Sequence, residues 1–233
     1  MSEKTSIILF GLTGHGKSSI ANMLIQGDIY HNRDNSFKIN DKVGGASVQI
    51  QGCTNDKFIV YDTIGVAVTS VGNVPHKKAV KTIRNYFSIC EAPLNYIAFV
   101  VKKGRISEEV MQVFKIFKEI FKDSEKSFII IITCSRPKWI DENIGDLRKY
   151  FENYPIIPVD FPFEEEDDDD GIAAIHQNRR RESIQRLTDR LSFLNYKGSK
   201  LQALSSFHLG KENLADEQLI KGISGAIASI ILL

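Results

Sequence analysis

The chain has 233 residues, of which 42% are hydrophobic, and its formal net charge is +1. This length and composition suffice for one α/β domain with an extension, while the balanced charge gives no long-range field that favours nucleic acid or a membrane. Its 3 cysteines, Cys53, Cys90 and Cys134, are odd in number and well separated, which argues against a disulfide framework or a zinc site and predicts a cytoplasmic protein.

The first predicted strand, Ser6–Phe10, leads into a glycine-rich turn and then into a helix over Ser18–Ile25. The turn fits the phosphate-binding pattern G-x-x-x-x-G-K-[ST] at every position, and strand, turn and helix form the context that separates a P-loop from a chance match. We therefore expect nucleotide contacts from Gly11, Leu12, Thr13, Gly14, His15, Gly16, Lys17, Ser18 and Ser19.

The chemistry of a triphosphate explains the spacing of this turn. Backbone N–H groups in a tight loop, backed by a helix N-terminus, surround the clustered negative charges with partial positive charge. Gly11 and Gly16 let the backbone bend and approach closely. Lys17 supplies a full positive charge for the β- and γ-phosphates, and Ser18 offers a hydroxyl to Mg²⁺, which bridges the same phosphates. The alternative is a glycine-rich turn with an incidental lysine.

A second motif follows the strand predicted over Phe58–Tyr61, which ends in the D-x-x-G sequence Asp62-Thr63-Ile64-Gly65. At the carboxyl end of a neighbouring strand, Asp62 can hold Mg²⁺ through water, and the Gly65 N–H can contact a γ-phosphate. The alternative is a strand that ends in an ordinary turn. We assign Lys17, Asp62 and Gly65 to catalysis, and Ser18 and Asp62 to the metal.

Hydrophobic periods of 2 and 3.6 alternate along the rest of the chain. Further strands are predicted at Phe37–Ile39, Ser47–Ile50, Asn95–Val101, Phe128–Ile132 and Ile156–Val159. Helices are predicted at Lys77–Cys90, after an N-cap at Ser107, at Asp141–Phe151 and around Ile184–Leu194, with a mobile loop at Val66–Val74. This alternation predicts an α/β protein with the three-layer P-loop NTPase fold, in which helices cover both faces of a mostly parallel central sheet.

Two charged runs precede the last helix. Glu164–Asp170 is continuously acidic and predicts a solvated loop; a calcium site is the alternative, although the run lacks the alternating pattern of a calcium-binding loop. The triplet Arg179–Arg181 is interpreted as an electrostatic partner of that run, with a phosphate or partner contact as the alternative.

We divide the chain into a nucleotide-binding domain at residues 1–197 and an extension at 198–233 with an apolar terminal segment. The polar N-terminus predicts no signal peptide. From Leu219 the extension holds about 15 apolar-rich residues, which are too few to span a bilayer comfortably. Two interpretations of Gly222–Leu233 stay open: a helix docked on the domain or on another copy, and a peripheral membrane or oligomerisation segment.

Two blocks of sequence resemble the immunity-associated GTPases of the GIMAP type, septin-like members of the translation-factor class of P-loop GTPases. The first block is Gly11–Ser19 with Asn22–Gly27, and the second is Pro93–Val100 with Gly104–Glu109. The similarity covers about Lys4 to Asn195. It implies a GTP-binding domain with GTP or GDP and Mg²⁺ as ligands, slow hydrolysis, and nucleotide-controlled homodimers or filaments, often at membranes.

The chain departs from this family at the base motif. Guanine is normally selected by an aspartate that follows a lysine or histidine by two residues after a strand, and Arg136 stands at the matching place. Base choice is therefore open. Thr133 and Trp139 are assigned to the nucleotide on this side, and the alternative for Trp139 is packing.

Two further departures concern hydrolysis. The switch threonine that completes the Mg²⁺ shell has no clean match, and Ser47, Gln49 and Thr54 are its candidates. Val66, rather than a glutamine that orients water, follows the D-x-x-G motif, so hydrolysis would rest on electrostatics and on an arginine from a partner or Arg105.

These features predict a GTP-binding switch with slow GTPase activity, whose nucleotide state controls self-association or partner binding. A nucleotide-bound scaffold without turnover and an ATP-using P-loop enzyme are the alternatives.

Overall fold

The computed structural model describes residues 4–27, 49–64, 94–162 and 169–198. Within these ranges the strands form one sheet in the order β2-β3-β1-β4-β5-β6. Their bounds are Thr5–Phe10 (β1), Gln49–Thr54 (β2), Phe58–Ile64 (β3), Tyr96–Lys102 (β4), Phe128–Thr133 (β5) and Ile156–Pro158 (β6). Neighbouring strands are parallel except for β2, which runs antiparallel to β3. The predicted mostly parallel sheet is confirmed.

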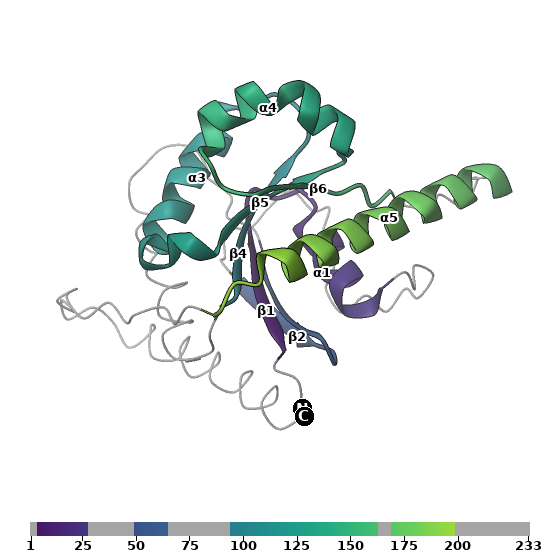
Figure 1. Cartoon of the computed structure of the whole chain (residues 1–233), viewed down its shortest axis with the longest axis horizontal. Helices are drawn as coiled ribbons and strands as arrows, with labels where there is room; N and C mark the ends of the chain where they lie inside the picture. Colours follow the sequence, from purple (N-terminus) through teal and green to yellow (C-terminus); the bar gives the residue numbers. More distant parts are fainter. Residues whose placement is uncertain (1–3, 28–48, 65–93, 163–168, 199–233) are drawn as a thin grey trace.

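Helices cover both faces of this sheet (Figure 1). Their bounds are Lys17–Gln26 (α1), Glu108–Ile120 (α3), Pro137–Phe151 (α4) and Asp170–Leu194 (α5), with a 3₁₀ helix at Lys122–Ser127. Residues of α3 and α4 pack on one face, while residues of α1 and α5 pack on the other. The predicted three-layer arrangement is therefore confirmed. None of the helices in the described part of the chain is long and apolar enough to cross a bilayer.

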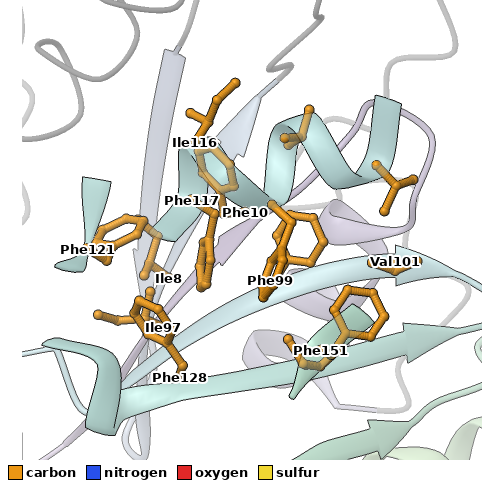
Figure 2. Packing of buried hydrophobic residues seen from close by; sticks show 14 of the residues in the cluster. Ile8, Phe10, Ile97, Phe99, Val101, Ile116, Phe117, Phe121, Phe128 and Phe151 are labelled. Atoms are coloured by element: carbon orange, nitrogen blue, oxygen red, sulfur yellow. The ribbon is translucent and has the colours of Figure 1, made fainter. Parts of the chain in front are cut away.

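The central strands are apolar at nearly every position because both of their faces are covered. In β1, Ile7 and Leu9 face the α1 and α5 layer, whereas Ile8 and Phe10 face the α3 layer. The α3 side is rich in aromatic rings (Figure 2), and the Phe117 ring lies 4.5 Å from that of Phe128. This packing holds the strands in register, and so it fixes where their carboxyl ends meet.

Helix boundaries differ from prediction at two places. Helix α4 begins at Pro137 instead of Asp141, because proline is pre-organised for the first helical position and Arg136 before it is extended. Helix α5 begins within the acidic run, where the Asp169 carboxylate accepts a hydrogen bond from the Ile172 N–H at 2.8 Å. The end of that run is thus a helix cap and first turn rather than a loop.

The N-cap predicted at Ser107 is confirmed, since its side chain accepts a hydrogen bond from the Val110 N–H. Several other predictions lie outside the described residues. They are Phe37–Ile39, Ser47, Gly65, Val66–Val74, Lys77–Cys90, most of the acidic run and the extension from 199 onward.

Candidate nucleotide-binding site

The glycine-rich turn lies at the carboxyl edge of the parallel strands, between β1 and α1. β1 ends at Phe10 and α1 begins at Lys17, with Gly16 as its N-cap at φ 86°. The predicted strand, turn and helix are therefore confirmed. Backbone N–H groups at the start of α1 have no partners within the helix, which makes this position suited to an anion.

The turn is pressed against the ends of β4 and β5. A Cβ atom on Gly11 would stand 2.3 Å from the carbonyl oxygen of Val100, and one on Gly16 would stand 3.1 Å from the Thr133 side chain. Thr133 also donates a hydrogen bond from its hydroxyl to the carbonyl oxygen of His15 at 2.9 Å. These contacts hold the turn in place on the sheet, which is the role the structure gives Thr133.

Lys17 lies inside the turn and is only 5% exposed. Its ammonium donates to the carbonyl oxygens of Gly11 at 3.0 Å and Leu12 at 2.9 Å. Burial lowers the pKa of this amine, and the nearby Asp62 carboxylate opposes that shift. An ammonium has three donors, so these two hydrogen bonds leave one donor and the positive charge for a phosphate.

Asp62 lies within β3 rather than after it, and it is 1% exposed. One carboxylate oxygen accepts a hydrogen bond from the Ser18 hydroxyl at 2.6 Å. The other, Oδ1, is buried and finds no hydrogen-bond partner among the described residues. Burial raises the pKa of Asp62, while the Ser18 hydrogen bond and the Lys17 charge oppose the rise.

This pair of side chains fits Mg²⁺. A hydroxyl and a carboxylate are the hard oxygen donors that the ion prefers, and a buried carboxylate oxygen without a partner is stabilised by a cation. The structure thus brings together the two residues that the sequence assigned to the metal.

His15 links the turn to the end of β4. Its Nδ1 accepts a hydrogen bond from the Lys102 N–H at 3.3 Å. Burial lowers the pKa of its imidazole, as do the charges of Lys17 and Lys102, while a backbone hydrogen bond at Val100 opposes this. The side chain of His15 is therefore a bridge within the site rather than a free base.

Trp139 lies in the first turn of α4 and packs, partly buried, against the aromatic cluster on the α3 side. The Lys103 ammonium lies 5.6 Å from the centre of its ring. These are packing contacts, which favours the alternative interpretation of Trp139. Thr54 pairs with Ile59 at the amino end of β3, away from Asp62, so its position excludes it as the switch threonine.

Sequence reasoning missed Asp160, which follows β6 at the same edge of the sheet as the turn. Its carboxylate lies 3.8 Å from the Arg136 guanidinium and 4.0 Å from that of Arg179. The available signal was an acidic residue directly after the last predicted strand, since the carboxyl ends of parallel strands share one edge.

The fold and the turn define a P-loop nucleotide-binding protein. The model of the AIG1 family matches residues 5–156, and the chain belongs to this family of GTP-binding domains. A similar solved structure is the bacterial selenocysteine-specific elongation factor EF-Sec, with a TM-score of 0.46 and 16% sequence identity. That match covers 83% of this chain, which spans 29% of the length of the elongation-factor chain.

Proposed function

We propose that this chain is a guanine-nucleotide switch that hydrolyses GTP slowly with Mg²⁺, and that its nucleotide state controls association with a second copy or a partner. The observation that carries the proposal is the convergence of the buried Lys17 ammonium with the Ser18–Asp62 pair at the carboxyl edge of the sheet. Residues 1–197 form the proposed G domain, and residues 198–233 form the extension.

In this proposal Lys17 turns its donors from the carbonyls of the turn to the oxygens of the β- and γ-phosphates. The low exposure of its ammonium strengthens that attraction, because a charge pair is screened less away from water. Ser18 and Asp62 hold the metal. A Mg²⁺ ion held there would supply positive charge against the β- and γ-phosphates. Gly65 is proposed to contact the γ-phosphate, and so to report its loss.

Slow turnover follows from the side chains that face the site. Among the described residues, Asp62 already accepts from Ser18, and the Nδ1 atom of His15 already accepts from Lys102. His15 could take a proton from an attacking water only after losing that contact, and the Oδ1 atom of Asp62, which has no partner in the described part of the chain, is assigned to the metal in this proposal. The rate then depends on positioning and electrostatics, and an arginine supplied by a partner can add roughly 10³–10⁵.

Nucleotide extraction and single-turnover hydrolysis test the proposal. Purified protein should release GDP or GTP on denaturation, and loaded protein should release phosphate in a Mg²⁺-dependent step. Lys17→Ala and Asp62→Ala should lose that step. Lys149→Ala is the matched control, since this lysine is exposed on α4 and pairs with Asp146.

Each failure has a separate meaning. If wild type and Lys17→Ala release phosphate at the same background rate while both retain GTP, the chain is a scaffold without turnover. If the extracted base is adenine, the ATP-using alternative is correct. Sedimentation of the full chain with GDP and with a non-hydrolysable GTP analogue tests the switch, and equal mass in both states would contradict it.

A further inference from the structure

The two residues assigned to the metal, Ser18 and Asp62, fix the direction in which a nucleotide would extend from the turn. Asp62 is on β3, on one side of β1 and its turn, whereas β4, β5 and β6 follow on the other side. A metal held by these two residues would serve the β- and γ-phosphates, so the base of a bound nucleotide would extend away from β3. Neighbouring strands are about 4.8 Å apart, so the ends of β5 and β6 lie roughly 10 and 14 Å from the turn. The base therefore belongs over the loops that follow these two strands.

Those two loops are joined to one another. The Ser135 N–H donates to the Val159 carbonyl at 3.0 Å, and the Val159 N–H donates to the Ile132 carbonyl at 2.9 Å. The residues that follow, Arg136 and Asp160, consequently lie side by side at the carboxyl edge. The buried hydroxyl of Ser135 has no hydrogen-bond partner within the described ranges.

The backbone of Asp160 is held in place, but its carboxylate makes no hydrogen bond to the two neighbouring arginines. Its backbone N–H donates to the Ser183 hydroxyl at 2.9 Å, which fixes the residue against α5. The guanidinium groups of Arg136 and Arg179 stand 3.8 and 4.0 Å away, beyond hydrogen-bonding distance. The side chain is 17% exposed and lines a cavity of about 280 Å³ between the start of α4 and α5. Its oxygens can therefore accept hydrogen bonds from a ligand.

We propose that Asp160 is the base-reading carboxylate of this domain and replaces the aspartate that is missing at Arg136. The inference rests on the proposed function and adds the residue that selects the base. Guanine presents two neighbouring donors, N1–H and the N2 amino group, which a carboxylate can accept together. Adenine presents an unprotonated N1 at that edge, so it would set a lone pair against the carboxylate. Arg136 lies beside the carboxylate as its ion-pair neighbour instead of reading the base.

Asp160→Asn tests this assignment by exchanging base preference. An asparagine amide keeps one acceptor and gains a donor, so it suits xanthine, which has a carbonyl at C2 in place of the amino group. Affinity for GDP should fall about 10–100-fold, as expected from the loss of a charged hydrogen bond. Affinity for xanthosine diphosphate (XDP) should rise. Both are measured by titration of fluorescent nucleotides with Mg²⁺ present.

Asp146→Asn is the matched control, because Asp146 is an exposed acid on α4 whose partner is Lys149. It should leave both affinities unchanged. An Asp160→Asn variant that binds GDP like wild type, or that loses GDP and XDP equally, overturns the inference and shows that Asp160 serves only its arginine neighbours. Wild type that binds no guanine nucleotide overturns the proposed function, and the inference with it.

A measurement on wild type alone covers the case in which Asp160→Asn does not fold. Inosine lacks the N2 amino group but keeps N1–H, so a carboxylate that accepts from both donors should bind IDP about tenfold or more weakly than GDP. Equal affinity for IDP and GDP would overturn the inference.

Discussion

Gly11→Ala tests the close fit between the turn and the sheet. The added Cβ would lie 2.3 Å from the Val100 carbonyl oxygen, whereas ordinary contacts begin near 3.4 Å, so one of the two must move by about 1 Å. Val100 cannot move freely, because β4 is paired with β1 on one side and with β5 on the other. We expect the turn to be displaced instead, with an overpacking cost of about 1–3 kcal/mol.

Gly14→Ala is the matched control for this substitution. Gly14 also has a positive φ of 76°, but a Cβ there would meet nothing within 4 Å. Gly14→Ala should therefore lose only the stability that corresponds to backbone strain at positive φ, about 1–2 kcal/mol. For a chain of this size each kcal/mol lowers Tm by about 2–4 °C, so an extra 2 kcal/mol places Gly11→Ala about 4–8 °C below Gly14→Ala.

The assay is thermal unfolding of nucleotide-free protein followed by circular dichroism, because bound nucleotide would add its own stabilisation. Nucleotide affinity should also fall further in Gly11→Ala, since its backbone N–H groups shift with the turn. Equal melting temperatures for the two variants would refute the reasoning, because the contact with Val100 would then carry no penalty.

Three further predictions concern stability. Phe117→Ala removes a ring that is fully buried and should lower the free energy of unfolding in urea by about 3–5 kcal/mol, whereas an effect below 1 kcal/mol would show that the cluster collapses around the gap. Ser107→Ala removes the α3 cap and should cost about 1 kcal/mol in the same assay, with an unchanged value as the contrary result. His15 has a lowered folded pKa, so the unfolded chain binds its proton first and stability is lost as pH falls from 6.5 toward that pKa. His15→Val should reduce this loss, and parallel pH profiles of Tm would contradict the assignment.

The turn and the central strands could be predicted because their signals are local. Gly11, Gly16 and Lys17 stand at spacings that the phosphate chemistry itself requires, and β5 is five consecutive apolar β-branched or aromatic residues before Thr133. The antiparallel pairing of β2 was not predicted, since pairing direction depends on which strand it meets. Thr54 became a wrong candidate for the same reason, because sequence distance does not show which edge of the sheet a residue occupies.

The start of α5 could not be predicted from hydrophobic periodicity. Only Arg180, Ser183, Leu187 and Leu191 are buried along this helix of 25 residues, and none of them lies in its first ten residues. Because the first half has no apolar stripe, the acidic run Glu164–Asp170 was interpreted as a solvated loop that included the start of this helix. The usable signal was the cap at Asp169, since an aspartate before a helix accepts the free N–H groups of the first turn.

The two ends of the proposed nucleotide site are encoded differently. The phosphate end is built by one continuous turn, so a motif finds it. The base end is built where the loops after β5 and β6 meet, and Asp160 reaches Arg136 only because β5 and β6 are parallel neighbours. A carboxylate can serve the same edge of a base from either loop, because only the position of its oxygens matters. The absence of aspartate at Arg136 therefore removes a sequence motif without removing the chemistry that guanine recognition needs.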